Sequence, residues 1–248
     1  MTRKELYSVA MMLVGLAAIL HLAHYLVFHD LHHTIIYMVG DVAFLPIDIL
    51  VLALIVERTL KRRELAAKSH KMNMVIGAFF SETGLPLLGL LDRFLPDDSP
   101  VYAHLAFDQT WSEADLIKAH KSVHQLKLDV WVDADGLKAV RQMLSTDKAF
   151  MLGLLQNPTL LEHESFTECL WSVFHLLEEL SARPSMMAPL PDSDIKHLSR
   201  DVQRAYVALL GEWVRYMAHL KSDYPYLYSF AARTNPFGPH RDAIVTEG

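Results

Sequence analysis

The chain has very little cysteine: Cys169 is the only one in 248 residues. A single cysteine excludes a disulfide framework and a thiolate metal cluster within one chain. The chain also lacks the P-loop and the motifs GxGxxG, HExxH and GxSxG. No catalytic constellation therefore stands out, and an enzyme ranks third among the functions considered below.

An excess of basic charge is absent as well. The formal net charge is -6 at pH 7, which disfavours a nucleic-acid partner. Basic residues are concentrated only in residues 58–71. Their position directly after two apolar runs, described next, explains them without a nucleic acid.

Two N-terminal runs are nearly free of charge. Residues 6–28 contain no Asp, Glu, Lys or Arg, and residues 34–56 are interrupted only by two aspartates and a proline. At about 1.5 Å per helical residue, each run can cross a hydrocarbon layer of roughly 30 Å. The connection, residues 29–33, is so short that the two helices must be antiparallel neighbours. Residues 1–57 are therefore predicted to form a two-helix transmembrane hairpin.

Lysine and arginine lie on one side of both runs. Arg3 and Lys4 precede the first run, the basic stretch follows the second, and the connection has neither residue. The positive-inside rule then places both termini in the cytoplasm and the connection outside. The basic stretch would lie beside the anionic inner leaflet. Cleavage of the first run as a signal peptide is disfavoured, because the run exceeds the usual apolar core of about 7–15 residues and lacks a small-residue cleavage site.

Residues 58–95 are predicted to form a basic juxtamembrane helix and a short apolar helix that lies at the membrane interface. A third crossing over residues 74–91 was the alternative. Glu82 and the break at Gly84 and Pro86 weigh against it.

Residues 96–235 show helical periodicity throughout, and no strand pattern is convincing. Together with the hairpin, this indicates an all-α fold: two transmembrane helices followed by a cytoplasmic helical bundle. Ser112 with Asp115 and Thr159 with Glu162 are typical helix starts. Residues 236–248 are expected to form a loose tail. The expected helices span about 112–132, 137–144, 146–156, 159–182 and 193–221.

Three runs, HDLHHT at 29–34, GDVAFLP at 40–46 and MNMVIGAFFSETG at 72–84, resemble a widespread prokaryotic family of two-span membrane proteins with a cytoplasmic helical domain. The resemblance covers most of the chain. It implies the topology above and a location in the prokaryotic cytoplasmic membrane, but no activity.

Asp41 and Asp48 carry the strongest functional signal, because a carboxylate inside a bilayer costs a few kcal/mol. Seven residues apart, they share one helix face at a spacing of about 10 Å. That face should point to the partner helix, to another subunit or to water. One interpretation is an ion or proton path lined by these carboxylates, and the other is hydrogen-bonded packing.

His21 and His24 lie on one side of the first helix. Folding the chain within the connection brings His21 level with Asp41. The histidines and the aspartate can share a proton or offer three ligands to a transition-metal ion. A structural hydrogen bond between the helices is the alternative.

The connection holds a dense set of metal-binding residue types: His29, Asp30, His32 and His33. In an oligomer these residues would form a ring at the mouth of a pore, suited to a metal contact or to pH sensing. The alternative is that histidines simply suit the membrane interface.

The helical domain offers one further set of ligand-type residues: the EHE run at 162–164 and His175 with Glu178 and Glu179 lie on one predicted helix. Di-iron bundles need glutamate and histidine pairs on two helices. The sequence shows no second matching helix, so a metal site here is not expected.

Two helices have no interior, so any conduit must be built from several copies. The leading hypothesis is a homo-oligomer in the lipid bilayer that forms a cation- or proton-conducting pore or an ion-binding site, gated by the cytoplasmic domain. The alternative is a membrane-anchored metal or pH sensor, or scaffold, that binds a cytoplasmic protein partner.

The distribution of lysine and arginine predicts that the C-terminus lies in the cytoplasm. A reporter fused after Gly248 that is active only in the cytoplasm should be active, whereas a reporter that requires export should be silent. The opposite pattern would refute the orientation.

Overall fold

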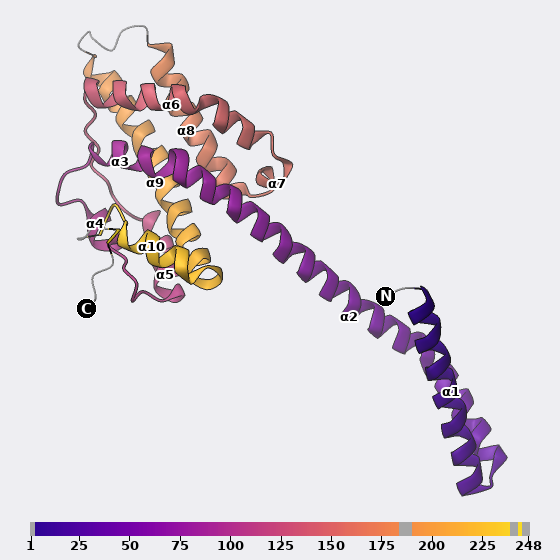
Figure 1. Cartoon of the computed structure of the whole chain (residues 1–248). Helices are drawn as coiled ribbons and strands as arrows, with labels where there is room; N and C mark the ends of the chain where they lie inside the picture. The colour runs from indigo at the N-terminus through magenta and orange to yellow at the C-terminus, as the bar shows by residue number, and fades with distance from the viewer. Residues whose placement is uncertain (1–2, 184–189, 239–242, 245–248) are drawn as a thin grey trace. The chain divides into compact units, whose positions relative to one another are not determined.

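The computed structural model of the protein describes residues 3–183, 190–238 and 243–244, and in these ranges every regular element is a helix (Figure 1). The all-α prediction is thus confirmed for the described residues. The chain divides into two compact units, Met1–Ala66 and Ala67–Gly248, which are described separately. The elements are α1 (Arg3–Phe28), α2 (Leu31–Phe79), the π-helix η1 (Phe80–Gly84), α3 (Leu85–Asp92), α4 (Pro100–Leu105), α5 (Glu113–Val123), α6 (Ala134–Leu155), α7 (Pro158–Leu161), α8 (Glu164–Ala182), α9 (Asp192–Asp223) and α10 (Pro225–Arg233).

The first unit is a hairpin of α1 and the first part of α2. The chain reverses over only His29 and Asp30. His29 adopts a left-handed conformation with φ of 50°, and its N–H donates to the Tyr25 carbonyl at 2.8 Å, as in a helix C-cap. The connection is therefore shorter than residues 29–33, because His32 and His33 already belong to α2.

The large apolar side chains of the first unit are exposed in a single copy. Met11 is 74% exposed and Val27 is 71% exposed, and the first part of α2 shows the same pattern. Two helices, α1 and α2, contain stretches long enough and apolar enough to cross a membrane. An apolar surface of this extent needs a cover of lipid or protein.

The second unit is a helical bundle built around α9. Helix α9 packs against α8, α5, α10 and α3, and α6 packs against α8 and α3 (Figure 1). Buried aromatic and aliphatic side chains from most of these helices form one core. Its largest fully buried side chains include Tyr206, Tyr228, Phe79, Phe80, Phe94, Phe107 and Phe166.

The segment before residue 96 contributes a large part of this core. Leu87, Leu88 and Leu91 of α3 are completely buried, as is Phe79 at the end of α2. The interfacial placement of this apolar helix is therefore wrong, and so is a third crossing, because protein rather than lipid covers these side chains. Residues 67–95 belong to the helical domain, and the basic residues 58–66 remain with the first unit.

The helix starts follow local capping chemistry, partly as predicted. Ser112 and Asp115 form the predicted capping box of α5, with the Ser112 N–H donating to the Asp115 carboxylate at 2.9 Å. Asp133 caps α6 by accepting from the Gly136 N–H at 2.8 Å. The predicted start of the next helix at Thr159 is wrong: α8 begins at Glu164, where the His163 ring accepts from the Phe166 N–H.

Two further boundaries differ from the prediction. α5 ends at Val123 rather than near residue 132, because the apolar side chains of residues 126–132 recur at every second position, as in an extended segment. The Trp131 N–H in this segment donates to the Phe94 carbonyl at 2.9 Å. α6 is one helix, not two short ones.

The ordered packing against the bundle extends further toward the C-terminus than predicted. Asn235 is completely buried, and its amide donates to the carbonyls of Leu105 at 2.8 Å and Phe107 at 3.1 Å. Phe237 is also buried. The predicted loose tail is therefore wrong for residues 236–238, and residues 239–242 and 245–248 lie outside the described part of the chain.

The core position of residues 76–94 predicts where the helical domain can be cut. A fragment of residues 67–248 should unfold cooperatively, whereas a fragment of residues 100–248 should not. Each buried Leu or Phe contributes about 1.5–3 kcal/mol. The free energy lost with this segment is therefore comparable to the whole free energy of unfolding of a typical domain, roughly 5–15 kcal/mol. Circular dichroism during thermal unfolding measures the difference. Equal cooperative transitions in both fragments would contradict the assignment.

Candidate functional site

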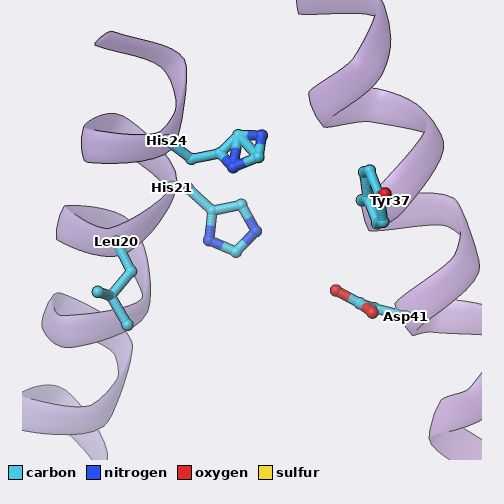
Figure 2. Close-up of a pocket in the computed structure, with 5 residues that line it drawn as sticks. All are labelled: Leu20, His21, His24, Tyr37 and Asp41. Carbon is cyan, nitrogen blue, oxygen red and sulfur yellow. The ribbon is translucent and has the colours of Figure 1, made fainter. Parts of the chain in front are cut away.

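A polar pocket lies between the two helices of the first unit. Leu20, His21 and His24 of α1 and Tyr37 and Asp41 of α2 line a space of about 260 Å³. Figure 2 shows both imidazole rings directed toward α2 and the Asp41 carboxylate directed back toward α1. The pocket therefore holds two bases, a phenol and a carboxylate within two otherwise apolar helices.

The local sequence explains why these side chains meet. His21 and His24 are three residues apart and Tyr37 and Asp41 are four apart, so each pair occupies one side of its helix. His21 lies eight residues before the reversal at His29 and Asp30, and Asp41 lies eleven residues after it, so the long side chains of this pair meet across a small offset in level. The predicted grouping of His21 and His24 with Asp41 thus has a geometric basis in the structure.

The hydrogen bond of His21 favours one tautomer. Its Nδ1 lies 2.9 Å from the Ala17 carbonyl oxygen. A carbonyl oxygen only accepts, so Nδ1 donates in this contact, and in a neutral ring the lone pair is then on Nε2. His21 thus presents a nitrogen that can accept a proton or bind a metal ion.

His24 lies among aromatic rings. Its ring centroid is 4.7 Å from that of Phe28 and 6.5 Å from that of Tyr37, the latter in an edge-to-face arrangement. These contacts fix the imidazole on the side of α1 that faces Asp41.

The other predicted site residues lie apart from this pocket. Asp48 is exposed two turns further along α2 and does not line it. His29, Asp30 and His32 are exposed around the reversal, and the side chain of His33 lies outside the described residues. Among the described side chains, no set of three metal-binding groups converges there. The loop metal site stays a prediction.

Cys169 has no role as a nucleophile. It is completely buried in α8, and this burial raises the pKa of its thiol well above the ordinary value, with the nearby charge of Glu212 adding to the effect. The thiol therefore stays protonated at neutral pH, and a buried cysteine of this kind is chemically inert.

Arg183 organises the carboxylates at the start of α9 and the end of α8. Its guanidinium donates two bonds to Asp194, at 2.6 and 3.0 Å, and one to Glu179 at 2.8 Å. These hydrogen bonds lower the pKa of both carboxyl groups below their ordinary values. Glu179 and Asp194 are therefore ionised well into the acid range.

The partner residues of this region are not evident when each helix of the sequence is considered alone. His175 with Glu178 and Glu179 then has no matching pair on a second helix. Helix α9 carries one, His197 with Asp201, and the structure brings it next to α8. The sequence does contain this pattern: in the helix on each side of the connection between α8 and α9, a histidine is followed four residues later by a carboxylate.

Comparison with known proteins matches two family models to the chain. The model described as "MJ1433, N-terminal helical domain" covers residues 2–60, and "Uncharacterized protein MJ1433, C-terminal helical domain" covers residues 68–233. The "Uncharacterized protein MJ1433" of Methanocaldococcus jannaschii is 35% identical over 245 residues, which are 99% of this chain and 98% of that protein. No solved structure matches. The resemblance to a prokaryotic family is confirmed, and the family boundary agrees with the division at residue 66.

The ion pairs of Arg183 predict an acid-dependent loss of stability. Glu179 and Asp194 have a lower pKa in the folded than in the unfolded chain, whose values are about 4.5 and 3.8. Their contribution is therefore complete above these values and is lost as the pH falls through the folded ones. When the pH is lowered from about 5 to about 3, the free energy of unfolding should fall less for Arg183→Gln than for wild type.

Chemical unfolding at several pH values measures this slope. Arg93→Gln, which removes an exposed arginine elsewhere in the same unit, should follow wild type. Parallel acid slopes for wild type and Arg183→Gln would refute the assignment.

Proposed function

The chain belongs to the MJ1433 family, whose two helical domains together span most of it, and from the geometry we propose an integral membrane protein that binds a proton or a cation between α1 and α2. In an assembly of several copies, this site forms part of a cation- or proton-conducting pore. The helical domain then acts as the assembly and gating domain on the cytoplasmic side.

One observation carries the proposal: ionisable side chains converge in a pocket within two helices that are otherwise apolar. Placing a carboxylate and two imidazoles in a bilayer is costly, and residues of this kind usually mark ion or proton pathways. The Nε2 lone pair of His21 and the Asp41 carboxylate are a natural proton-sharing pair. With His24, they would offer two nitrogens and one carboxylate to a cation only after the side chains approach one another, because their ligand atoms do not converge in the described structure.

The oligomer follows from the geometry of a hairpin. Two helices enclose no continuous path, and the remaining surface of the first unit is apolar and exposed in a single copy. Copies packed around an axis would cover part of this surface. Asp48, on the same side of α2 as Asp41 and about 10 Å along the helix, would continue the row of carboxylates.

The orientation rests on the charges that flank the two helices. Arg3 and Lys4 begin α1, further basic residues occur from Arg58 to Lys71 in α2, and the reversal has no lysine or arginine. In the prokaryotic cytoplasmic membrane, this pattern supports a cytoplasmic position for both termini and the helical domain. The pocket then lies nearer the outer side, within reach of external protons or cations.

A membrane-anchored sensor is the second candidate. The observation that favours it is that the pocket is complete within one copy and so needs no oligomer to bind its ion. The helical domain would then transmit occupancy of the pocket to a cytoplasmic protein. This candidate predicts binding without conduction.

Ion flux in liposomes separates the two. Wild type should carry protons or monovalent cations above the level of empty liposomes. Asp41→Asn should reduce the flux about tenfold or more, because it removes a charge whose interaction with a cation is worth at least 1.4 kcal/mol. His21→Ala should change the pH dependence of the flux rather than abolish it, because the imidazole only tunes the affinity of the site for protons.

Glu64→Gln is the matched control, since it removes a carboxylate from the same helix beyond the apolar run. It should behave as wild type. No flux in wild type, or equal flux in wild type and Asp41→Asn, would contradict the conduit. The sensor would then gain support from a cytoplasmic protein that co-purifies with wild type but not with Asp41→Asn.

A further inference from the structure

We propose that α8 and α9 form a second site, independent of the hairpin, which binds one divalent transition-metal ion through His175, Glu179, His197 and Asp201. The site lies in the helical domain. It would join the two helices that pack most extensively in that domain.

The pairing of the four residues follows from an antiparallel register. Each helix supplies a histidine and a carboxylate four residues further on, so both side chains lie on one face of their helix. His175 and Asp201 are equidistant along the chain from the middle of the connection, and so are Glu179 and His197. The histidine of each helix therefore lies opposite the carboxylate of the other.

The distances between the groups fit a shared ion. His197 Nε2 is 3.3 Å from a Glu179 oxygen and 3.3 Å from Asp201 Oδ2, and His175 Nε2 is 3.5 Å from Asp201 Oδ1. Ligand atoms of His175, Glu179 and Asp201 all lie within 4.8 Å of one another; His197 is not part of this set and joins it through its contacts with Glu179 and Asp201. Four ligands at about 2.0–2.1 Å from a tetrahedral ion lie roughly 3.3 Å apart. Charge-assisted hydrogen bonds are shorter, at about 2.7–2.9 Å.

Asp201 gives an independent sign of a missing partner. Its side chain is only 2% exposed, and its Oδ2 accepts no hydrogen bond although it is shielded from solvent; the His197 Nε2 at 3.3 Å neutralises this oxygen only when that ring is protonated. A buried carboxylate oxygen without such a bond is costly. An ion between Asp201 and the two histidines would satisfy it.

The arginines nearby do not replace the ion. Arg204 lies 3.1 Å from Asp201 Oδ1 but is 57% exposed, and it does not reach Oδ2. The guanidinium of Arg183 donates hydrogen bonds to both Glu179 and Asp194. In metal sites, carboxylate ligands are often held by such outer partners. The hydrogen bond from Arg183 also lowers the pKa of the Glu179 carboxyl group, which keeps it ionised for binding.

The donor set indicates the class of ion. Two imidazole nitrogens and two carboxylate oxygens suit zinc or another first-row divalent ion rather than magnesium or calcium, which prefer oxygen alone. Both histidines are partly exposed, at 43% and 49% of their side chains, so an ion can enter from solvent. Binding would tie the end of α8 to the start of α9.

Zinc titration of the full-length protein in detergent tests the site. His21→Ala/His24→Ala serves as the background and removes the imidazoles of the hairpin pocket; any Zn²⁺ bound at His29, Asp30, His32 and His33 is recognised because it survives the loss of His175 and His197. After treatment with EDTA and its removal, calorimetry should show about one tight Zn²⁺ site per chain. Adding His175→Ala and His197→Ala to the background should lower the affinity of this site for Zn²⁺ by more than about 100-fold. Loss of a residue that only supports a ligand usually costs less than this.

Two further variants make the result specific. His219→Ala removes the histidine of another such pair on α9, which lies 3.1 Å from Asp223, and it should keep the Zn²⁺ site. Asp201→Asn should lose the site and the increase in Tm that Zn²⁺ gives the background protein. No tight Zn²⁺ site in the background, or equal binding after loss of His175 and His197, would overturn the proposal.

Discussion

The register of an antiparallel helix pair is the constraint on which both polar clusters of this protein depend. When two helices are joined by a short connection, residues at equal chain distances from its middle lie at the same level. The reversal at His29 and Asp30 brings His21 and Asp41 to one pocket, although His21 lies eight residues before it and Asp41 eleven residues after it. The connection between α8 and α9 does the same for His175 and Asp201. Inserting one residue within a helix, between one of these side chains and the connection, would rotate that side chain away from its partner by about 100°.

The two clusters differ in what surrounds them. In the hairpin, the polar pocket lies within apolar helices whose outer surface is exposed in a single copy, so its energetics depend on what covers that surface. In the helical domain, Asp201 is enclosed by the protein itself. A proton or cation in the first cluster therefore suits a function at the membrane, whereas an ion in the second would stabilise the packing of two helices.

The sequence predicts the features that local chemistry determines, and fails where packing determines them. The Ser112 capping box and the extent of α9 could be read directly. Residues 85–95 could not be placed, because a short apolar helix looks the same under a membrane and inside a bundle; the buried Leu87 and Leu91 decide it. His163 was missed because histidine is an unusual cap. The His197 and Asp201 pair was missed because each helix was considered alone.

The central claim is that Asp41 and His21 share a titrating site, and infrared spectroscopy of the protein in lipid measures this most directly. A pH titration should show a carboxyl band in wild type that is absent from Asp41→Asn, and His21→Ala should change the midpoint of that band. A spectrum that is the same for wild type and Asp41→Asn, or a midpoint that does not respond to His21→Ala, would contradict the account.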